Sequence, residues 1–427
     1  MRDEPLSAMM QAGMTGWSKA VQPINKTDVT RRSALTLAAS AAALALGGCS
    51  GSGLSGFPGM DGFGSSGPAP NAGGGPSSGP TIGAGRVKIG LILPLTAPGQ
   101  GGVVGNSMRN AAELSLSEFQ GADVTLLVKD DRGTADGARA AADEAFREGA
   151  ELLIGPLFAP AVQAAGQAAR AANRPLIGFS TDATVAARGV YLLSFLAETE
   201  VERVISYASA QGKRSYGALV PDSPYGKVTE AEFQQAVARR GGRVVVIERY
   251  SPSPEKIRES IGRIAQALPQ MDALFVPESA DNLPFVSETL IQSGLNPAKV
   301  KLIGTGVWND SRVFRIAGLQ GGWFAAPDTA GFNAFAGRYR AKFNSDPTRN
   351  ATLAYDAVSL SAALVRTQGT QRFAESVLTN PSGFAGADGV FRFRPDGISE
   401  RGLAVLQVNN GSATTISAAP RDLGRAT

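Results

Sequence analysis

The stretch from Leu126 to Pro156 constrains the fold of this chain more than any other. It opens with a short apolar run, Leu126–Val128, and closes with a second one, Leu152–Ile154, that shows no polar alternation. Apolar residues stand between them at the spacing of one helix face: Ala138, Ala141, Ala142, Ala145 and Phe146. A strand–helix–strand unit of about 30 residues forms a right-handed crossover between parallel strands. The predicted fold class is therefore α/β, with parallel sheets covered by helices on both faces.

Two adjacent acids, Asp130 and Asp131, follow the first strand of this stretch. A carboxylate pair at a strand end suggests acid/base chemistry or a metal site. The alternative is that both residues cap the next turn and helix, where Thr134 and Asp136 are also candidate N-caps. We favour the capping interpretation, because Asx and Thr side chains accept backbone N–H bonds at such positions.

Strand and helix patterns recur along the rest of the chain in two series of similar length. This predicts two doubly wound lobes. The alternating runs Val390–Phe393 and Leu403–Val408 predict a closing hairpin. Residues 418–427 are expected to form a frayed tail.

The N-terminal segment has the pattern of a bacterial export signal. Arg31 and Arg32 precede the apolar run Ala34–Leu46, which is too short for a membrane-spanning helix of about 20 residues. The paired arginines resemble a twin-arginine signal, and Leu46-Gly47-Gly48-Cys49 resembles a lipobox, the processing site of bacterial lipoproteins. Residues 1–48 are therefore predicted to be a signal, with Cys49 lipidated. Ser50 after the cysteine favours retention in the outer membrane.

Residues 49–85 consist mainly of Gly, Ser, Pro and Ala. Such a segment has too few apolar side chains to offset its ordering entropy, so we predict a disordered tether. It would allow a lipid-anchored body to work at a distance from the membrane, in the periplasm.

Composition excludes several classes of function. The chain has no histidine, which excludes a Ser-His-Asp triad and the usual zinc sites. Its 41 basic and 37 acidic residues nearly balance, and no stretch interleaves basic and aromatic residues, so nucleic acid is not an expected partner. We expect no catalytic residues, no metal and no cofactor. One cysteine cannot form a disulfide within the chain.

Several motifs, in their order and spacing, resemble the type I periplasmic solute-binding proteins, in particular the leucine-binding-protein branch. The motifs are IGLILPLT, VKDDRGTADGARAAADE, ELLIGP, PLIGFSTDA, ALVPDSPYG, LIGTGVW and ATLAYDAVSLSAAL, spread from Val87 to about Asn410. The resemblance implies two lobes that are joined by three hinge crossings and hold a ligand between them. By position, the crossings fall near Phe195-Leu196, Ala325-Ala326 and Asp388-Gly389. They assign 86–195 and 326–388 to the first lobe, and 196–325 and 389–417 to the second. It also implies capture of a solute for an ABC importer, without catalysis.

Ligands of open α/β sheets bind beyond the carboxyl ends of the strands. The residues that the sequence places at these ends are the predicted ligand-binding residues. They are Gln100, Gly101, Phe158, Ala159, Ser180, Thr181, Asp182, Tyr225, Glu278 and Trp308. Glu278 is a candidate partner for a ligand ammonium group, and Trp308 a candidate stacking platform. The competing interpretations are a helix cap for Ser180–Asp182, turn packing for Tyr225 and a solvated loop acid for Glu278.

Three positions depart from the amino-acid-binding members of the family. The hydroxyl that the resemblance implies for the ligand carboxylate falls at Ala161, and the acid that it implies for the ammonium falls at Gly306. Asp182 stands where a hydroxyl is expected, and an anion there repels a carboxylate. The solute is therefore left open between an amino acid and a cationic, amide-rich or larger peptide-like molecule.

The predicted function is a lipid-anchored periplasmic solute-binding protein that delivers amino acids or peptide-like solutes to an ABC permease. The alternative on the same fold is an outer-membrane lipoprotein that activates a penicillin-binding protein, with a peptidoglycan synthase as partner. A third class, an enzyme acting through Asp130 or Asp182, is the least supported.

The lipobox gives the first testable prediction. Cys49→Ala removes the thiol that would carry the lipid, so the variant should move from the membrane fraction to the soluble periplasmic fraction. Detergent phase partitioning of cell extracts measures this. If the variant stays in the detergent phase, the lipoprotein assignment is wrong.

Overall fold

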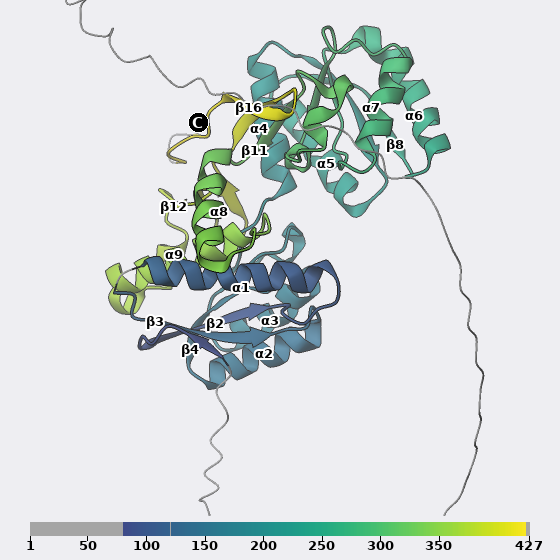
Figure 1. Cartoon of the computed structure of the whole chain (residues 1–427). Helices are drawn as coiled ribbons and strands as arrows, with labels where there is room; N and C mark the ends of the chain where they lie inside the picture. Colours follow the sequence, from purple (N-terminus) through teal and green to yellow (C-terminus); the bar gives the residue numbers. More distant parts are fainter. Residues whose placement is uncertain (1–79, 120, 424–427) are drawn as a thin grey trace, which may run out of the picture. The chain divides into compact units, whose positions relative to one another are not determined.

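The computed structural model describes residues 80–119 and 121–423 (Figure 1). The predicted signal, Cys49, and the part of the predicted tether up to residue 79 lie outside the described residues. Two larger sheets and one small sheet organise the described part, and each larger sheet has helices on both faces. The α/β class with two mainly parallel sheets is therefore confirmed.

Among the described residues, six strands form the first sheet. Their spatial order is β1 (Thr81–Ile82), β3 (Val124–Asp130), β2 (Val87–Leu93), β4 (Ala150–Ile154), β5 (Leu176–Gly178) and β6 (Val190–Leu192). All neighbours pair in parallel except β1 and β3. The stretch Leu126–Pro156 spans β3 and β4 with helix α2 (Ala135–Arg147) between them, as predicted.

Small apolar residues pack helices against both faces of this sheet. Helices α2 and α3 (Ala159–Ala171) form one buried cluster with Leu127 and Leu153. Helices α1 (Gln100–Glu118) and α9 (Ala351–Thr367) pack on the opposite face of this sheet, where they cover Ile89. Figure 1 shows α1 and α2 on opposite sides of β2 and β4. Helix α8 (Thr329–Phe343) packs against α1 through Phe335, and the short helix α10 (Glu375–Leu378) follows α9. We call this part of the structure the first lobe.

Seven strands of the described chain form the second sheet. Their order is β16 (Ser412–Ser417), β15 (Ala404–Asn409), β11 (Trp323–Ala326), β10 (Lys301–Gly304), β9 (Ala273–Phe275), β7 (Ser215–Pro221) and β8 (Arg243–Tyr250). The strands from β8 to β11 are parallel, and β15 and β16 are antiparallel additions at one edge.

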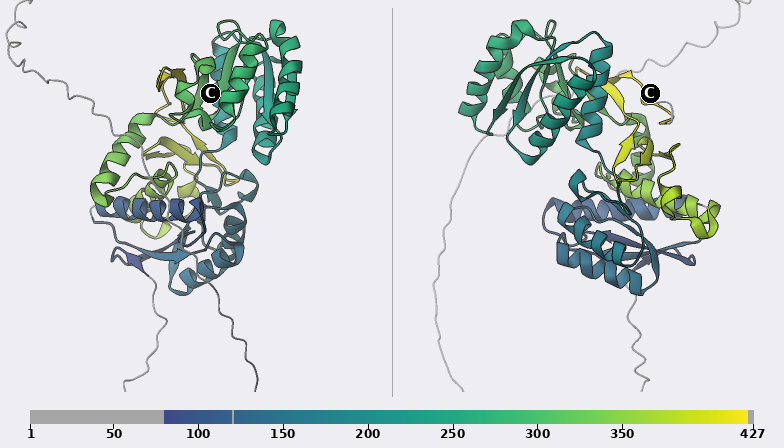
Figure 2. Two further views of the ribbon diagram at one scale, coloured as in Figure 1. Left: turned by 45° about the vertical axis from the view of Figure 1, so that its right-hand side comes forward. Right: turned by 180° about the vertical axis from the view of Figure 1, so that it is seen from behind.

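Helices also cover both faces of the second sheet, as Figure 2 shows. Helices α4 (Ala197–Ala210) and α5 (Pro224–Arg239) lie on one face, where the rings of Phe233 and Phe275 stack with centroids 5.1 Å apart. Helices α6 (Pro254–Ala267) and α7 (Leu283–Gln292) lie on the other. We call this part the second lobe.

The predicted closing hairpin is wrong. Strand β13 (Gly389–Phe393) pairs with β12 (Phe384–Gly386) and β14 (Ser399–Arg401) in a small antiparallel sheet, whereas β15 pairs with β11 and β16. Phe391 and Phe393 are buried in the core of the first lobe, so 389–401 pack there and not with the second lobe. The third crossing between the lobes therefore lies between β14 and β15, later than predicted, because alternation does not identify the partner of a strand.

Both ends of the described chain are more ordered than predicted. Thr81 and Ile82, placed in the tether, pair with Leu127 and Leu126 and extend the first sheet. At the other end, within the predicted tail, Leu423 is buried and its carbonyl accepts a hydrogen bond from Arg392. In both places an apolar side chain within a mostly polar segment, Ile82 or Leu423, is partly or fully buried.

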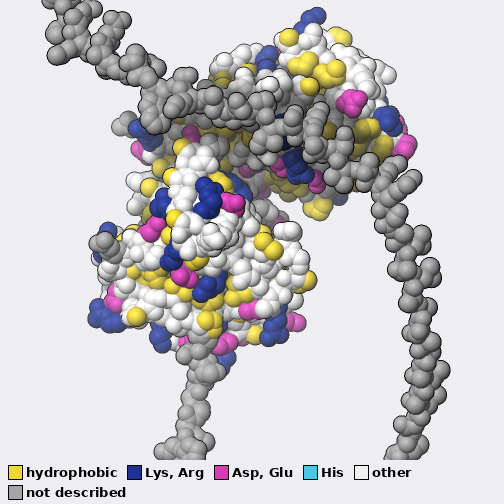
Figure 3. Space-filling model, viewed as in Figure 1, with side chains coloured by type: hydrophobic (Ala, Val, Ile, Leu, Met, Phe, Trp, Pro, Cys, Tyr) yellow, Lys and Arg dark blue, Asp and Glu magenta, His cyan; other side chains and the backbone are white. Residues whose placement is uncertain are grey.

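The described residues contain no helix with the length and apolar character needed to cross a bilayer. Figure 3 shows basic and acidic side chains interspersed over the described residues of one face. This mixture agrees with the nearly equal totals of the two kinds of residue in the sequence.

Asp130, the last residue of β3, and Asp131, which follows it, accept backbone hydrogen bonds in the next turn, as we expected. Asp131 Oδ1 accepts from the Gly133 amide at 2.7 Å, and Thr134 Oγ1 caps α2 by accepting from Gly137 N at 3.0 Å. Asp131 is fully buried, and its Oδ2 has no hydrogen-bond partner among the described residues. Burial, assisted by the neighbouring charge of Asp130, raises the pKa of Asp131 to about 6.

Asp131→Asn should stabilise the protein at alkaline pH. The folded-state pKa lies above the unfolded value, so stability from the protonated acid is present below pH 4 and is lost as the pH rises through about 6. Asn keeps the acceptor for Gly133 without the charge. We expect the free energy of unfolding to rise by about 1–3 kcal/mol at pH 8, with a much smaller gain near pH 4.5. Urea titrations at both pH values measure this.

The exposed Asp143→Asn on α2 is the matched control, with an expected change of less than about 0.5 kcal/mol. An Asp131→Asn gain of equal size at both pH values would contradict the burial argument.

Candidate ligand-binding site

A cavity of about 570 Å³ is lined by residues that follow strands of both lobes. We call it the main cavity. Its lining consists of Thr181, Asp182, Phe195, Ala197, Glu200, Pro224, Tyr225, Val228, Gly306, Val307, Asn309, Ala326, Pro327, Arg349 and Asn350. The volume falls within the roughly 300–1,000 Å³ typical of small-molecule sites, and apolar walls with a few polar groups are also typical.

Three of the predicted residues line the main cavity: Thr181, Asp182 and Tyr225. Asp182 also caps the next turn, accepting from Thr184 N at 2.9 Å, so its capping and cavity-lining roles coexist. The Tyr225 hydroxyl is 2.6 Å from Thr305 Oγ1, which fixes the ring on the cavity wall.

The remaining predicted residues lie outside this lining. Ser180 is buried, and its Oγ accepts from Asp182 N at 3.0 Å. Trp308 is fully buried, and its Nε1 donates to Val276 O at 3.1 Å, so it is a core residue and not a stacking platform. The others, at the starts of α1 and α3 in the first lobe, are Gln100, Gly101, Phe158 and Ala159.

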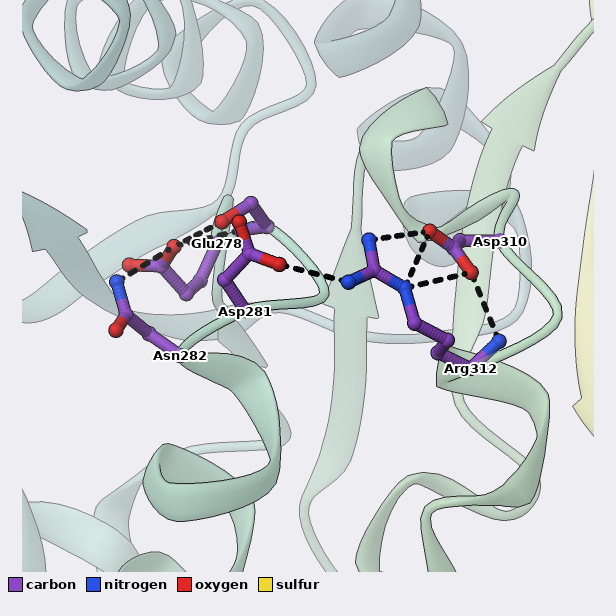
Figure 4. Close-up of polar contacts among 6 residues, drawn as sticks. Glu278, Asp281, Asn282, Asp310 and Arg312 are labelled. Carbon is purple, nitrogen blue, oxygen red and sulfur yellow. Dashed lines mark hydrogen bonds and ion pairs between the residues drawn. The ribbon is translucent and has the colours of Figure 1, made fainter. Parts of the chain in front are cut away.

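Glu278 lines a smaller cavity of about 280 Å³, which shares Tyr225 and Val307 with the main cavity. Its carboxylate is held from several sides. The Tyr250 hydroxyl and the Ser279 amide donate to it, the latter at 2.7 Å. Figure 4 shows Glu278 facing Asn282, next to a separate ion-pair group in which Arg312 bridges Asp281 and Asp310. Glu278 is thus a buried, satisfied acid, not the solvated loop acid that was the alternative.

The acid that sequence reasoning missed is Glu200, in the first turn of α4. Its Oε2 accepts from the Gly306 amide at 2.9 Å. A Cβ added to Gly306 would lie 2.4 Å from Glu200 Oε1, so the carboxyl occupies the space beside this glycine. The family resemblance expects an acid at position 306, and in this structure α4 brings a carboxyl to that place from 106 residues away.

No cation touches the Glu200 carboxyl among the described residues. Burial raises its pKa to about 7, while the Gly306 amide and the more distant charge of Arg349 act in the opposite direction. Neighbouring Glu198 also has a raised pKa through burial, and its Oε2 has no hydrogen-bond partner in the described part of the chain. Glu200 and Asp182 are the two acids in the described lining of the cavity.

The second missed group is Arg349, which precedes α9 and lines the cavity from the first lobe. Its guanidinium lies 4.4 Å from the ring centroid of Phe195, at the first crossing. The sequence does contain a signal for Glu200: two acids, Glu198 and Glu200, stand in the first turn of α4, directly after the first crossing. Nothing local marks Arg349, because its position depends on how α9 packs.

The functional groups of the site limit the chemistry that it can perform. Among residues 80–119 and 121–423, no group of three or more His, Cys, Asp or Glu side chains is arranged to hold a metal. The site offers a carboxyl, a guanidinium, amides and hydroxyls around an apolar volume. Such groups bind and orient a small polar solute.

Two doubly wound α/β lobes, with a mainly apolar cavity that contains a few polar groups at the strand ends, are typical of a bilobal solute-binding protein. The profile of the periplasmic binding protein family matches residues 86–413, and the chain belongs to that family. The solved structures described below share the type I, leucine-binding-protein-like fold, so the fold expected from the resemblance is confirmed. The family comprises binding proteins and not enzymes, in agreement with the prediction from sequence.

Solved structures share the fold at low sequence identity. A provisionally assigned branched-chain amino acid ABC transporter protein from Rhodospirillum rubrum superimposes with a TM-score of 0.69 at 21% identity, covering 77% of this chain and 99% of that one. A solute-binding protein from Rhodopseudomonas palustris BisB5, in complex with 3,4-dihydroxybenzoic acid, gives a TM-score of 0.58 at 21% identity, covering 79% and 97%.

The branched-chain amino acid substrate-binding protein LivJ from Streptococcus pneumoniae, in complex with isoleucine, gives a TM-score of 0.57 at 20% identity, covering 78% and 99% of the two chains. No curated protein sequence matches the chain. The similar structures therefore include both amino-acid and aromatic-acid complexes, and the solute must be argued from this chain's own residues.

The contact between Glu200 and Gly306 predicts the effect of Gly306→Ala. The added methyl group must displace the Glu200 carboxyl and break its bond to the 306 amide, at a cost of about 1–2 kcal/mol of unfolding free energy. Urea denaturation measures this. In a Glu200→Ala background the same change should cost little, since the clash is gone.

Gly262→Ala in α6 is the control, because nothing lies within 4 Å of its added Cβ. It should be neutral or slightly stabilising. An undiminished cost of Gly306→Ala without Glu200 would show that the carboxyl is not the constraint.

Proposed function

We propose that this protein captures an amino acid, or another small solute with a protonated amine, and delivers it to an ABC importer. Family membership supports solute capture, and the similar structures described as amino-acid ABC transporter proteins support the importer. The observation that carries the choice of solute is Glu200, a buried carboxyl on the cavity wall that no described cation touches.

The electrostatics favour an amine over a purely anionic aromatic acid. A buried carboxyl without a counter-charge pays a desolvation cost, which is why its pKa rises to about 7. An ammonium group at hydrogen-bond distance would supply the counter-charge. A benzoate-like ligand would instead bring a second anion towards Glu200 and Asp182.

Capture would follow from lobe closure. Phe195, Ala197, Ala326 and Pro327 line the main cavity and lie where the chain passes between lobes. A solute that contacts both lobes would favour a closed arrangement and exclude water, as in hinge-bending binding proteins. A permease could then distinguish loaded from empty protein by its shape.

We also propose that the protein is anchored by a lipid on Cys49 in the bacterial envelope, with the outer membrane favoured by Ser50. The support is the lipobox resemblance and the Gly/Ser/Pro-rich segment that follows it. The alternative partner, a peptidoglycan synthase, becomes one outcome of the solute screen below.

The test is a thermal-shift screen of the protein against amino acids, diamines, aromatic carboxylates and muropeptides, followed by calorimetry. Near pH 7, binding an ammonium should lower the pKa of Glu200 and release up to about half a proton, seen as heats that depend on buffer ionisation enthalpy. Glu200→Gln should remove the proton release and weaken amine binding by about 10–100-fold.

The control is Glu202→Gln, on the same helix, where Glu202 pairs with Arg239 and Arg240 away from the cavity. It should bind like the wild type. Binding of aromatic carboxylates but not amines would refute the choice of solute. No response to any solute, with a peptidoglycan synthase recovered from solubilised membranes, would favour the activator function.

A further inference from the structure

The main cavity has one basic residue in its described lining, Arg349. Its charge is close enough to lower the pKa of Glu200, although the two groups form no ion pair. The described lining thus contains a basic group, Arg349, and an acidic group, Glu200, which we call the positive and the negative pole of the cavity. This arrangement suits a ligand that carries both charges.

The Arg349 guanidinium is held rigidly. Nη1 and Nη2 donate to the two carboxylate oxygens of buried Asp388 at 2.9 and 2.8 Å, and Nη1 also lies 3.1 Å from Thr352 Oγ1. Phe195 and Phe332 lie under the guanidinium, with ring centroids at 4.4 and 4.8 Å. Nε has no hydrogen-bond partner among the described residues. A guanidinium fixed in this way loses little further entropy when it binds an anion.

A second, buried arginine adds positive charge behind the first. The Arg401 side chain is 2% exposed, and none of its three guanidinium nitrogens has a hydrogen-bond partner in the described chain. It lies 5.2 Å from the Phe195 ring centroid, and its nearest acid oxygen, Asp356 Oδ2, is 3.9 Å away. Burial raises the pKa of Asp356 to about 7, so near neutral pH this acid compensates Arg401 only in part.

The charges around Phe195 therefore do not cancel. Arg349 and Arg401 contribute two positive charges, while Asp388 contributes one negative charge and Asp356 a partial one. In a low-dielectric hinge region this excess is felt strongly by an anion in the adjoining cavity.

We propose that Arg349 binds the carboxylate of the solute, so that the site selects zwitterions: the amine at Glu200 and the carboxylate at Arg349. This inference rests on the proposed function. It also resolves two features of this chain. Ala161 is buried in α3 and offers no hydroxyl, and Asp182 repels an anion, so a carboxylate needs a donor elsewhere.

The experiment combines ligand and side-chain changes. The amino acid that binds best is compared with its carboxamide and with the corresponding decarboxylated amine, by calorimetry on the whole protein. The wild type should prefer the amino acid over both analogues by about 10–100-fold, the range for a charged hydrogen-bonded group. Arg349→Gln should reduce this preference to less than about threefold, while Arg349→Lys keeps part of it.

Arg366→Gln is the matched control, because the Arg366 guanidinium also lies over a phenylalanine ring, that of Phe119, at 4.7 Å, but Arg366 is in α9 and outside the cavity lining. It should keep the wild-type preference. If Arg349→Gln does not fold, because Asp388 is left buried without its partner, the double variant Arg349→Gln/Asp388→Asn replaces it and should show the same loss of preference.

The outcomes separate the two claims. If the wild type binds the decarboxylated amine as tightly as the amino acid, or if Arg349→Gln weakens amino acid and carboxamide equally, Arg349 is not the carboxylate partner, although the proposed function survives. If the wild type binds none of these compounds, both claims are wrong.

Discussion

The packing of helices on both faces of two parallel sheets is the constraint on which the rest of the structure depends. Once both faces are covered, as for β2 by α1 and α2, the polar backbone at the strand ends must be satisfied in loops. Parallel strands place those loops at one edge. The cavity forms there because residues such as Thr181, Tyr225 and Gly306 follow β5, β7 and β10 respectively.

The chemistry of the cavity depends on charges that the fold leaves uncompensated. Glu200 accepts one amide bond but meets no cation among the described residues, and Arg401 has no hydrogen-bond partner there. Such groups cost stability, and binding sites are where proteins retain them. The two poles lie on α4 and next to α9, elements of different lobes, so one ligand that joins both poles would also hold the lobes together.

Much of the fold could be predicted from residue patterns. The period-3.6 apolar stripe of α2 and the unbroken apolar runs of β3 and β4 identify a parallel α/β sheet, and these three elements lie where the sequence predicts them. The closing hairpin failed because β13 and β15 have similar alternation but different partners. Phe391 packs in the core of the first lobe, which only the three-dimensional arrangement shows.

The sequence by itself determined the fold class, the turn and cap roles of Asp130 and Asp131, and the presence of Thr181, Asp182 and Tyr225 at a cavity. These follow from local backbone chemistry and from the rule that sites lie at strand ends. Only the tertiary structure decided that Trp308 is a core residue and that Glu200 takes the place of the missing acid at Gly306. A carboxyl can reach one point in space from many places along the chain, and packing alone selects which.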